Sequence, residues 1–288
     1  MTTAVPENAE SQEAWNGVLF ERFVRFRATI VVGLGRHGEK AMAICPPASG
    51  ERVLDIGCGF GDASQQLAAL VGPSGSVLGV DIAPRFIEAA RAEAEMAGVA
   101  NVRFEARDVQ ATQFADTFDY AFSRFGTMFF DNAVVALRNV RAAMAPGGRL
   151  CIVVWRRRFD NPWIYEAEKV VKPVLQEPEA TDEPRCGPGP FSMADADTTS
   201  GQLAAAGFAN VALHRVDLPL LIGKTLAEAV ALNMALGPAA EAIRLAGAQA
   251  ERMRPELERL LCAALTPFVT TDGSVVADSS TWVVVATA

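Results

Sequence analysis

The sequence is poor in histidine and cysteine, which often serve as metal ligands or catalytic groups. It has two histidines, His37 and His214, and five cysteines, none of which form a C-x-x-C pair. The cysteines are odd in number and far apart in the chain, which argues against a disulfide framework and against a zinc site. We therefore expect free thiols in a reducing, cytoplasmic compartment and no metal in the functional site.

Positive charge and long apolar runs are also scarce. The 288 residues contain 26 Lys and Arg against 34 Asp and Glu, a net charge of −8. Binding to a nucleic-acid backbone needs a basic face, so nucleic acid is not the expected partner. No apolar stretch is long enough to span a bilayer, and the polar N-terminal residues lack the pattern of a signal peptide. We expect neither a membrane span nor secretion.

The most informative stretch is residues 53–62, VLDIGCGFGD, in which an apolar run ends in Asp55 and glycines follow on alternate positions. This pattern indicates a buried strand, a tight loop and the start of a helix, where backbone N–H groups favour anions. The glycines let the backbone approach a ligand closely. A dinucleotide fingerprint requires a glycine where this chain has Asp62, so a nicotinamide-dependent oxidoreductase is disfavoured. The three glycines are Gly57, Gly59 and Gly61.

Two further acids follow strand-like segments downstream. Asp81 ends the segment 76–81 and stands twenty residues after Gly61, the spacing at which an acid reaches ribose hydroxyls in nucleotide-binding folds. Asp108 follows the segment 101–106 in the same way. Because parallel strands end at one edge of a sheet, these acids are expected to share a site with Asp55.

These motifs, with residues 118–125 and 145–150, resemble the class I S-adenosylmethionine (SAM)-dependent methyltransferases, and among them the small-molecule branch related to quinone-ring C-methyltransferases. The resemblance covers residues 1–155. It implies an α/β fold, a Rossmann-like seven-stranded sheet of order 3-2-1-4-5-7-6 whose last strand is antiparallel, with helices on both faces. An N-terminal helical cap and helical lid insertions complete the expected architecture.

The pattern of the chain divides it into four regions. We expect an N-terminal cap over 1–45, a SAM-binding core over 46–155, an excursion over 156–195, and a last region, 196–288, with a helical lid at about 222–270. Strands are expected at 52–56, 77–81, 102–106, 118–122, 149–155, 211–216 and 281–286, and helices at 62–71, 84–97, 132–144, 162–176, 195–206, 225–234 and 238–264.

The N-terminal region is expected to be disordered over residues 1–12 and then to form one amphipathic helix over 13–32. Glycines at 33, 35 and 38 are expected to break it, which places His37 in a loop before a short helix at 39–45.

The resemblance implies that SAM is the cofactor and S-adenosylhomocysteine its product. The loop backbone would line the methionine portion, and Asp55 would face its amino group. Asp81 would accept hydrogen bonds from both ribose hydroxyls, and Asp108 would accept one from the adenine amino group. The expected cofactor-binding residues are Asp55, Gly57, Cys58, Gly59, Asp81, Ile82, Asp108, Val109 and Ser123.

Methyl transfer is an in-line displacement in which alignment lowers the barrier, so a general base is optional. His37 is the candidate catalytic residue, as a base or as an acceptor contact. Arg124 is expected to hold an anionic group of the acceptor or the cofactor's carboxylate, a role also open to Arg36. The expected acceptor-binding residues are Arg124, Phe125, Met128, Trp163 and Tyr165.

The sequence therefore predicts a SAM-dependent methyltransferase that modifies an O, N or C atom of a small, apolar or aromatic metabolite. Two alternatives remain open: a relative that uses SAM structurally for a decarboxylase- or hydroxylase-like reaction, and a non-catalytic SAM-binding subunit. The apolar segment 226–236 suits either a hydrophobic acceptor or a homodimer face.

Overall fold

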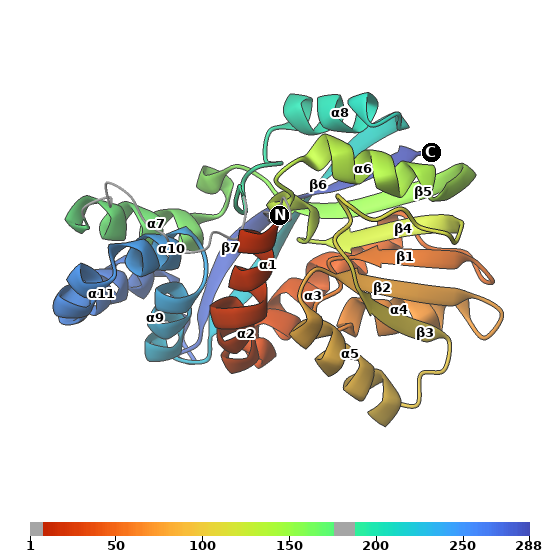
Figure 1. Ribbon diagram of the computed structural model, residues 1–288. Helices are drawn as coiled ribbons and strands as arrows, with labels where there is room; N and C mark the ends of the chain where they lie inside the picture. The colour runs from red at the N-terminus through yellow and green to blue at the C-terminus, as the bar shows by residue number, and fades with distance from the viewer. Residues whose placement is uncertain (1–7, 176–187) are drawn as a thin grey trace, which may run out of the picture.

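The computed structural model describes residues 8–175 and 188–288. Within them, seven strands form one sheet in the order β3-β2-β1-β4-β5-β7-β6, with β7 antiparallel to both of its neighbours (Figure 1). The predicted fold class and strand order are confirmed. The strands are β1 (Arg52–Ile56), β2 (Ser76–Asp81), β3 (Val102–Ala106), β4 (Phe118–Arg124), β5 (Met144–Trp155), β6 (Ala209–Gly223) and β7 (Val275–Thr287).

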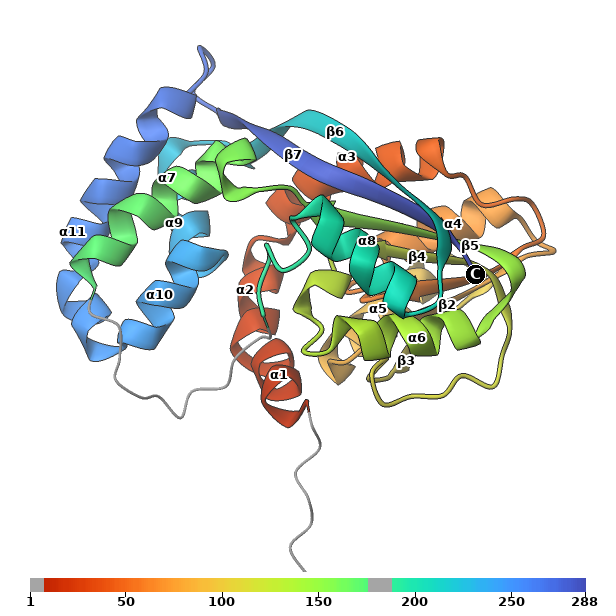
Figure 2. The same cartoon turned by 90° about the horizontal axis from the view of Figure 1, so that it is seen from above.

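Helices cover both faces of the sheet. Figure 2 shows α3 (Arg27–Ile44) and α4 (Asp62–Val71) on one face, with α6 (Ala133–Ala142) and α8 (Ala196–Ala205) on the other, while α5 (Pro84–Met96) packs along β2 and β3. The central strands are mostly apolar because both faces are covered; Val53, Leu54 and Ile56 of β1 are fully buried.

The remaining helices gather at the edge of the sheet where the parallel strands end (Figure 1). Chain excursions that follow β5 and β6 must start from that edge, and the N-terminal helices join them there. These elements are α1 (Ala9–Ala14), the π-helix η1 (Trp15–Leu19), α2 (Phe20–Arg25), the 3-10 turns η2 (Thr127–Phe129), η3 (Arg158–Asp160), η4 (Lys172–Val174) and η5 (Thr266–Phe268), α7 (Pro162–Val171), α9 (Leu226–Ala235), α10 (Pro238–Ala246) and α11 (Ala248–Leu265).

Helix α3 corrects the prediction that glycines would break the N-terminal helix. It runs without interruption through all three of them, so His37 lies inside a helix and not in a loop. A β-carbon on Gly33 would lie 2.7 Å from the Leu220 side chain on β6, and one on Gly38 would lie 3.0 Å from Cδ of Arg124. These two glycines therefore allow α3 to approach the sheet and the site closely, and tertiary packing outweighs their low helix propensity.

The predicted single helix over residues 13–32 is also wrong in detail. The chain kinks at Gly17, whose φ of −105° and ψ of −111° are not helical, and again at Phe26. Helix α1 begins at Ala9, inside the stretch expected to be disordered, and residues 1–7 of that prediction lie outside the described part of the chain. We call α1, η1 and α2 the cap helices.

Other observed ends of helices and strands differ from the predicted ones, because they depend on packing that the sequence does not reveal. Helix α6 ends at Ala142 and β5 begins at Met144, where it pairs with Phe118. Strand β6 is longer than predicted because it pairs with β7 along most of its length. The predicted helix over 238–264 is two helices, α10 and α11, that meet at Gly247.

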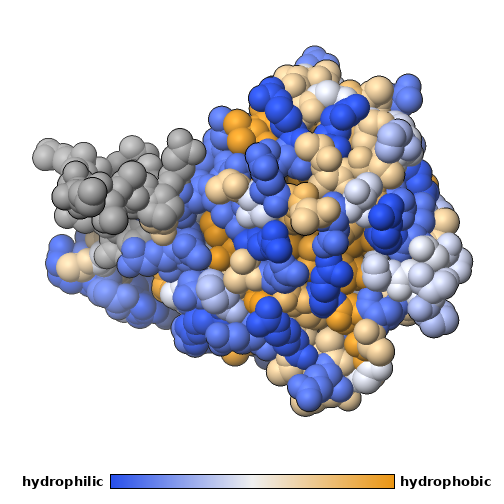
Figure 3. All heavy atoms as spheres, turned by 45° about the vertical axis from the view of Figure 1, so that its right-hand side comes forward, coloured by the Kyte–Doolittle hydropathy of each residue, from blue (hydrophilic) through white to orange (hydrophobic). Residues whose placement is uncertain are grey.

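The apolar segment 226–236 packs largely against other parts of the same chain. Ala229, Val230 and Leu232 of α9 are buried, and α9 packs against α10, α11 and β6. No single described helix is long and apolar enough to cross a membrane, and only α9 and α10 together, bent by 62°, meet that test. On the face drawn in Figure 3, hydrophilic and apolar residues are interspersed.

Candidate functional site

The loop between β1 and α4 is tightly wound and packs against a second glycine. Gly57 has a φ of +66°, and a β-carbon built on it would lie 2.9 Å from the Cα of Gly126, in the connection after β4. The N–H groups of Gly57 and Cys58 donate to the Val80 carbonyl at 2.8 and 3.0 Å. A side chain at position 57 would therefore be strained and crowded, and the loop is tied to the end of β2.

Asp55 is a buried carboxylate beneath this loop. The Ser64 hydroxyl, from the first turns of α4, donates to it at 2.5 Å. Burial raises the pKa of Asp55 to about 7, although the Ser64 hydrogen bond and the Arg124 charge both act to lower it. A buried carboxyl group whose charged form is disfavoured gains from a cationic ligand group placed beside it.

Asp81 ends β2 and is held by the backbone on either side. The N–H groups of Gly59 and Ala83 each donate to one of its oxygens at 3.0 Å. Burial raises the pKa of Asp81, and these backbone hydrogen bonds oppose that shift. A carboxylate accepts about four hydrogen bonds, so acceptor positions remain for two more donors, the number that a ribose diol supplies.

The outer end of the predicted cofactor site lies under the N-terminal segment. The Asn8 side chain donates to the Asp108 carboxylate at 2.5 Å, and Gln12 donates to the Ile82 carbonyl at 3.2 Å. Val109, next to Asp108, is buried in the main core. The N-terminal segment therefore contacts two of the residues predicted to hold the adenine, Asp108 and Ile82.

Aromatic side chains anchor the cap helices to the loop. The Phe86 ring of α5 lies at the centre of the cluster. Its centroid is 6.5 Å from that of Trp15, 5.0 Å from that of Phe20, 6.0 Å from that of Phe23 and 4.9 Å from that of Phe60 in the loop. This cluster packs on the loop and on α5, so the cap helices and the loop form one packed unit.

Arg124, the last residue of β4, reaches the start of α4. Its Nη2 pairs with Asp62 at 2.7 Å, and the two side chains are 12% and 17% exposed. Helix α3 covers its stem at Gly38. Its Nη1 is buried and has no hydrogen-bond partner among the described residues. One buried donor of the guanidinium thus lacks an acceptor.

Ser123 is turned away from the loop surface. It is fully buried, and its hydroxyl donates to the Ile56 carbonyl at 2.7 Å, which joins the ends of β4 and β1. The Ser123 side chain therefore supports the contact between Gly57 and Gly126 and is not placed for a ligand contact, in contrast to our prediction.

A wall of three aromatic rings lies at the ends of β4 and β5. Phe125 stacks on Trp155 at 4.4 Å, and Trp155 meets Trp163 edge-on at 6.2 Å. Phe125 has a φ of +64°, a strained conformation for a residue with a side chain and one that is common at functional sites. The Trp163 Nε1 is buried without a partner among the described residues. We call Phe125, Trp155 and Trp163 the aromatic wall.

Two other predicted acceptor contacts, Met128 and Tyr165, pack against other residues of the chain. Met128 is buried, and its Sδ accepts the Trp155 N–H at 3.4 Å. Tyr165 lies two residues after Trp163 on α7, which turns it to another side of the helix, where it packs against the exposed Phe159. Trp155, which the prediction missed, occupies the central position instead; its place as the last residue of a strand was the available signal.

His37 lies behind the aromatic wall. Its two ring nitrogens are 2.8 Å from the Ser279 hydroxyl and 3.0 Å from the Thr281 hydroxyl, both on β7. Burial lowers the pKa of His37 to about 4, and the charges of Arg36 and Arg124 add to this. A fully buried, neutral imidazole engaged at both nitrogens favours a positioning role over the predicted role as general base.

Arg36 does not approach the loop. It is exposed and donates to the Pro219 carbonyl on β6 at 3.3 Å.

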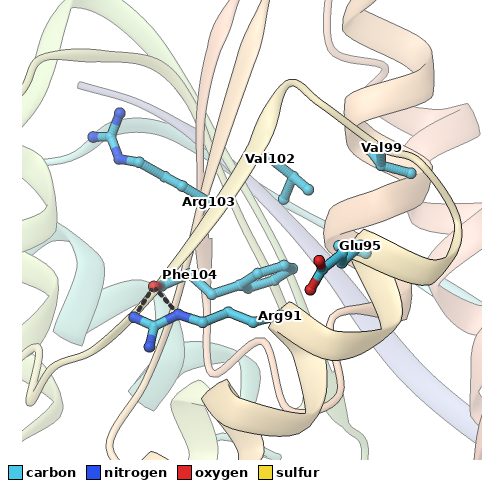
Figure 4. Close-up of a pocket in the computed structure, with 7 residues that line it drawn as sticks. Arg91, Glu95, Val99, Val102, Arg103 and Phe104 are labelled. Carbon is cyan, nitrogen blue, oxygen red and sulfur yellow. Dashed lines mark hydrogen bonds between the residues drawn. The ribbon is translucent and has the colours of Figure 1, made fainter.

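A pocket of about 300 Å³ lies elsewhere, between α5 and β3 (Figure 4). Arg91 donates to the Phe104 carbonyl across its floor, at 2.6 and 3.1 Å. The Phe104 ring belongs to a core cluster with Cys58 and comes within 2.7 Å of the position of a β-carbon on Gly61, so it separates this pocket from the loop. The pocket is therefore not the predicted site.

The site combines three acids, a guanidinium edge and an aromatic wall at one edge of the sheet. The described residues contain no cluster of His, Cys, Asp and Glu arranged to hold a metal ion. Asp55 suits a cationic group, Asp81 suits a diol and Arg124 suits an anion, so the arrangement fits a zwitterionic nucleoside beside a flat apolar molecule.

Comparison with known proteins agrees with this chemistry. Residues 47–183 match the family model described as a methyltransferase domain. Aklanonic acid methyltransferase of Streptomyces is 40% identical over 39% of this chain and 52% of its own length, so the chain spans about half of that relative. The ubiquinone/menaquinone biosynthesis C-methyltransferase of Saccharophagus degradans is 31% identical over 58% of this chain and 71% of its own length.

Among solved structures, the YcgJ protein of Bacillus subtilis superposes with a TM-score of 0.55 over 88% of this chain and 97% of that chain, at 17% identity. At that identity the likeness establishes the fold alone.

Proposed function

The chain belongs to the class I SAM-dependent methyltransferases, and we propose that it transfers a methyl group to a small aromatic metabolite that lies against the aromatic wall. The SAM molecule supplies a methyl group on a positively charged sulfur. The observation that carries the proposal is the position, at one edge of the sheet, of the buried Asp55, the partly buried Asp81 and the stacked rings of Phe125 and Trp155.

The chain's own residues supply binding and alignment. Asp81 would accept the ribose hydroxyls, Asp55 would face the amino group, and the backbone at Gly57 and Gly59 would line the chain between them. Asp108 and Ile82 would hold the adenine once the contacts from Asn8 and Gln12 give way. Asp81 and Asp55 fit the cofactor because Asp81 keeps acceptor positions for further donors and Asp55 is a buried carboxyl group without a cationic partner at hydrogen-bond distance.

The acceptor is proposed to be flat and largely apolar. The aromatic wall supplies an apolar, aromatic lining, and the unpartnered Nε1–H of Trp163 suits an oxygen acceptor such as a carbonyl or phenol. The aklanonic acid and quinone-biosynthesis relatives support an aromatic acceptor. No described side chain is placed as an obvious base, which suits an acceptor that is acidic enough to lose its proton without help, or catalysis by alignment.

The free thiols Cys45, Cys58, Cys151 and Cys262 support the predicted cytoplasmic location.

The test is incubation of the protein with SAM carrying a labelled methyl group and a panel of phenols, hydroquinones and aryl ketones. We expect labelled product and S-adenosylhomocysteine to form in equal amounts for at least one acceptor. If SAM binds and an acceptor is converted while no S-adenosylhomocysteine forms, methyl transfer is the wrong reaction and a structural use of SAM takes its place. If SAM binds and no member of a broad panel reacts, the non-catalytic alternative is favoured.

A further inference from the structure

We propose that Arg124 binds the carboxylate of the cofactor's amino-acid end through Nη1, and that Asp62 is the positioning residue that holds the guanidinium in place. This inference depends on the proposed function, because it requires SAM in the site. Of the two roles that the sequence leaves open for Arg124, it selects the cofactor's carboxylate over an anionic group of the acceptor.

The first argument is the unfilled edge of the guanidinium. Asp62 occupies Nη2 at 2.7 Å, and α3 passes over the stem at Gly38, so the side chain is held in one orientation. Nη1 is buried without a partner among the described residues. A buried charged donor that lacks an acceptor is unfavourable, and an anionic ligand atom removes that cost.

The second argument is the distribution of charge. Asp55, Asp62 and Asp81 surround the loop, and they suit the sulfonium and ammonium groups of the cofactor but repel its carboxylate. The ammonium and the carboxylate are bonded to the same carbon, so their protein partners must lie near each other. The Arg124 charge opposes the rise that burial causes in the pKa of Asp55, which is consistent with that proximity.

The third argument is that other arginines along this edge are directed elsewhere. Arg36 donates to the Pro219 carbonyl, Arg22 donates to the Ala235 carbonyl at 3.1 Å, and Arg85 pairs with Glu21 at 2.6 Å. Arg124 is the arginine that ends a central strand and touches the first residue of α4. It therefore has the position that a carboxylate next to the loop requires.

The experiment is a binding cycle that needs no acceptor. Affinities of S-adenosylhomocysteine and of its decarboxylated analogue are measured by calorimetry for the wild-type chain, Arg124→Met, Asp62→Asn and the exposed control Arg259→Met. We expect the wild type and the control to bind S-adenosylhomocysteine at least ten-fold more tightly than the analogue. Arg124→Met is expected to lose this preference while its affinity for the analogue changes less than two-fold, and Asp62→Asn to reduce the preference by three-fold or more.

Several outcomes would overturn the inference. They are a wild type that binds both ligands equally, an Arg124→Met variant that retains the preference, and an Arg124→Met variant that weakens for both ligands by the same factor. An unchanged preference in Asp62→Asn overturns the positioning role. If Arg124→Met does not fold, the inference is tested by the preference of the wild type for S-adenosylhomocysteine over the analogue and by its reduction in Asp62→Asn. A wild type that binds neither ligand contradicts the proposed function itself, which separates the two failures.

Discussion

The hydroxyl of Ser64 donates a 2.5 Å hydrogen bond to the carboxyl group of Asp55, and both side chains are buried where β1 turns into α4. Even with this hydrogen bond, burial holds the pKa of Asp55 at about 7. The ligand-free protein thus carries this carboxyl partly protonated near neutral pH. A cationic group that binds beside it favours the charged form and lowers that pKa.

Cofactor binding is therefore expected to release a proton. Below pH 7 the free protein must lose the Asp55 proton before it can pair with the ammonium group, so affinity for S-adenosylhomocysteine should fall as the pH falls from 8 to 6, by at most about ten-fold per pH unit. Calorimetry at pH 6.5 in buffers of different ionisation enthalpy measures the release. Asp55→Asn should bind more weakly and without this pH dependence; an equal pH dependence in that variant would exclude Asp55 as its source.

Substitution of Asp81 tests the ribose contact. Asp81→Ala removes the acceptor for two hydroxyl groups and should weaken S-adenosylhomocysteine binding by ~1–3 kcal/mol. Asp278→Ala, which removes an exposed carboxylate on β7, is the matched control and should bind as the wild type does. An unchanged dissociation constant in Asp81→Ala would remove this residue from the site.

The close packing around Gly57 predicts that a side chain at this position lowers the stability of the fold. Gly57→Ala must bear both a strained positive φ and a contact of 2.9 Å with the Gly126 Cα. Gly147→Ala has a φ of +78° and nothing within 4 Å, so it carries the strain alone. Urea denaturation should show Gly57→Ala to be less stable than Gly147→Ala by ~1–3 kcal/mol, the usual cost of overpacking. Equal losses in the two variants would mean that the Gly57–Gly126 contact is not tight in solution.

The lowered pKa of His37 predicts that the protein loses stability in mild acid. Its pKa is about 4 in the folded chain against 6.5 for the free side chain, so the unfolded state binds the proton more readily. The stabilising contribution of neutral His37 is complete above pH 6.5 and is lost as the pH falls from 6.5 to 4, up to about 3 kcal/mol. Denaturation midpoints at pH 7 and pH 5 should differ in the wild type and differ less in His37→Gln, which keeps partners for both hydroxyls. An equal shift in both chains would assign the acid sensitivity to other groups.

Substitution of Trp163 in the aromatic wall is expected to affect acceptor binding and to leave cofactor binding unchanged. Trp163→Phe keeps an aromatic ring but removes the unpartnered Nε1–H. For an acceptor found by the labelling assay, kcat/KM should fall on the order of ten-fold, the effect of one lost hydrogen bond. The dissociation constant of S-adenosylhomocysteine should stay unchanged. A parallel loss of cofactor affinity would show that Trp163 does not belong to an acceptor subsite.

Much of the sheet follows from local patterns. Strand β1 and helix α4 lie where the sequence predicts them because an apolar run, a glycine loop and helix formers follow one another without conflict. The acids Asp55, Asp81 and Asp108 could be assigned to one edge because parallel strands share their direction. These features depend on residues close together in the chain.

What the sequence could not show depends on distant partners. Gly33 and Gly38 look like helix breakers until β6 and Arg124 are seen to press against them. The unfilled Nη1 of Arg124 depends on Asp62 taking the other nitrogen, and the central place of Trp155 depends on Phe125 stacking upon it. Propensity and spacing carry no information about such contacts.

The hydrogen bonds of His37 join residues 242 and 244 positions apart in the chain. During synthesis, α3 leaves the ribosome long before β6 and β7, against which it packs, have been translated. The partners of His37 on β7 are translated last, so these hydrogen bonds form after the rest of the sheet has been made, and contacts so far apart in sequence form slowly. Ribosome-bound fragments that stop before Val275 should therefore expose α3 to proteases, even when the first five strands have already assembled.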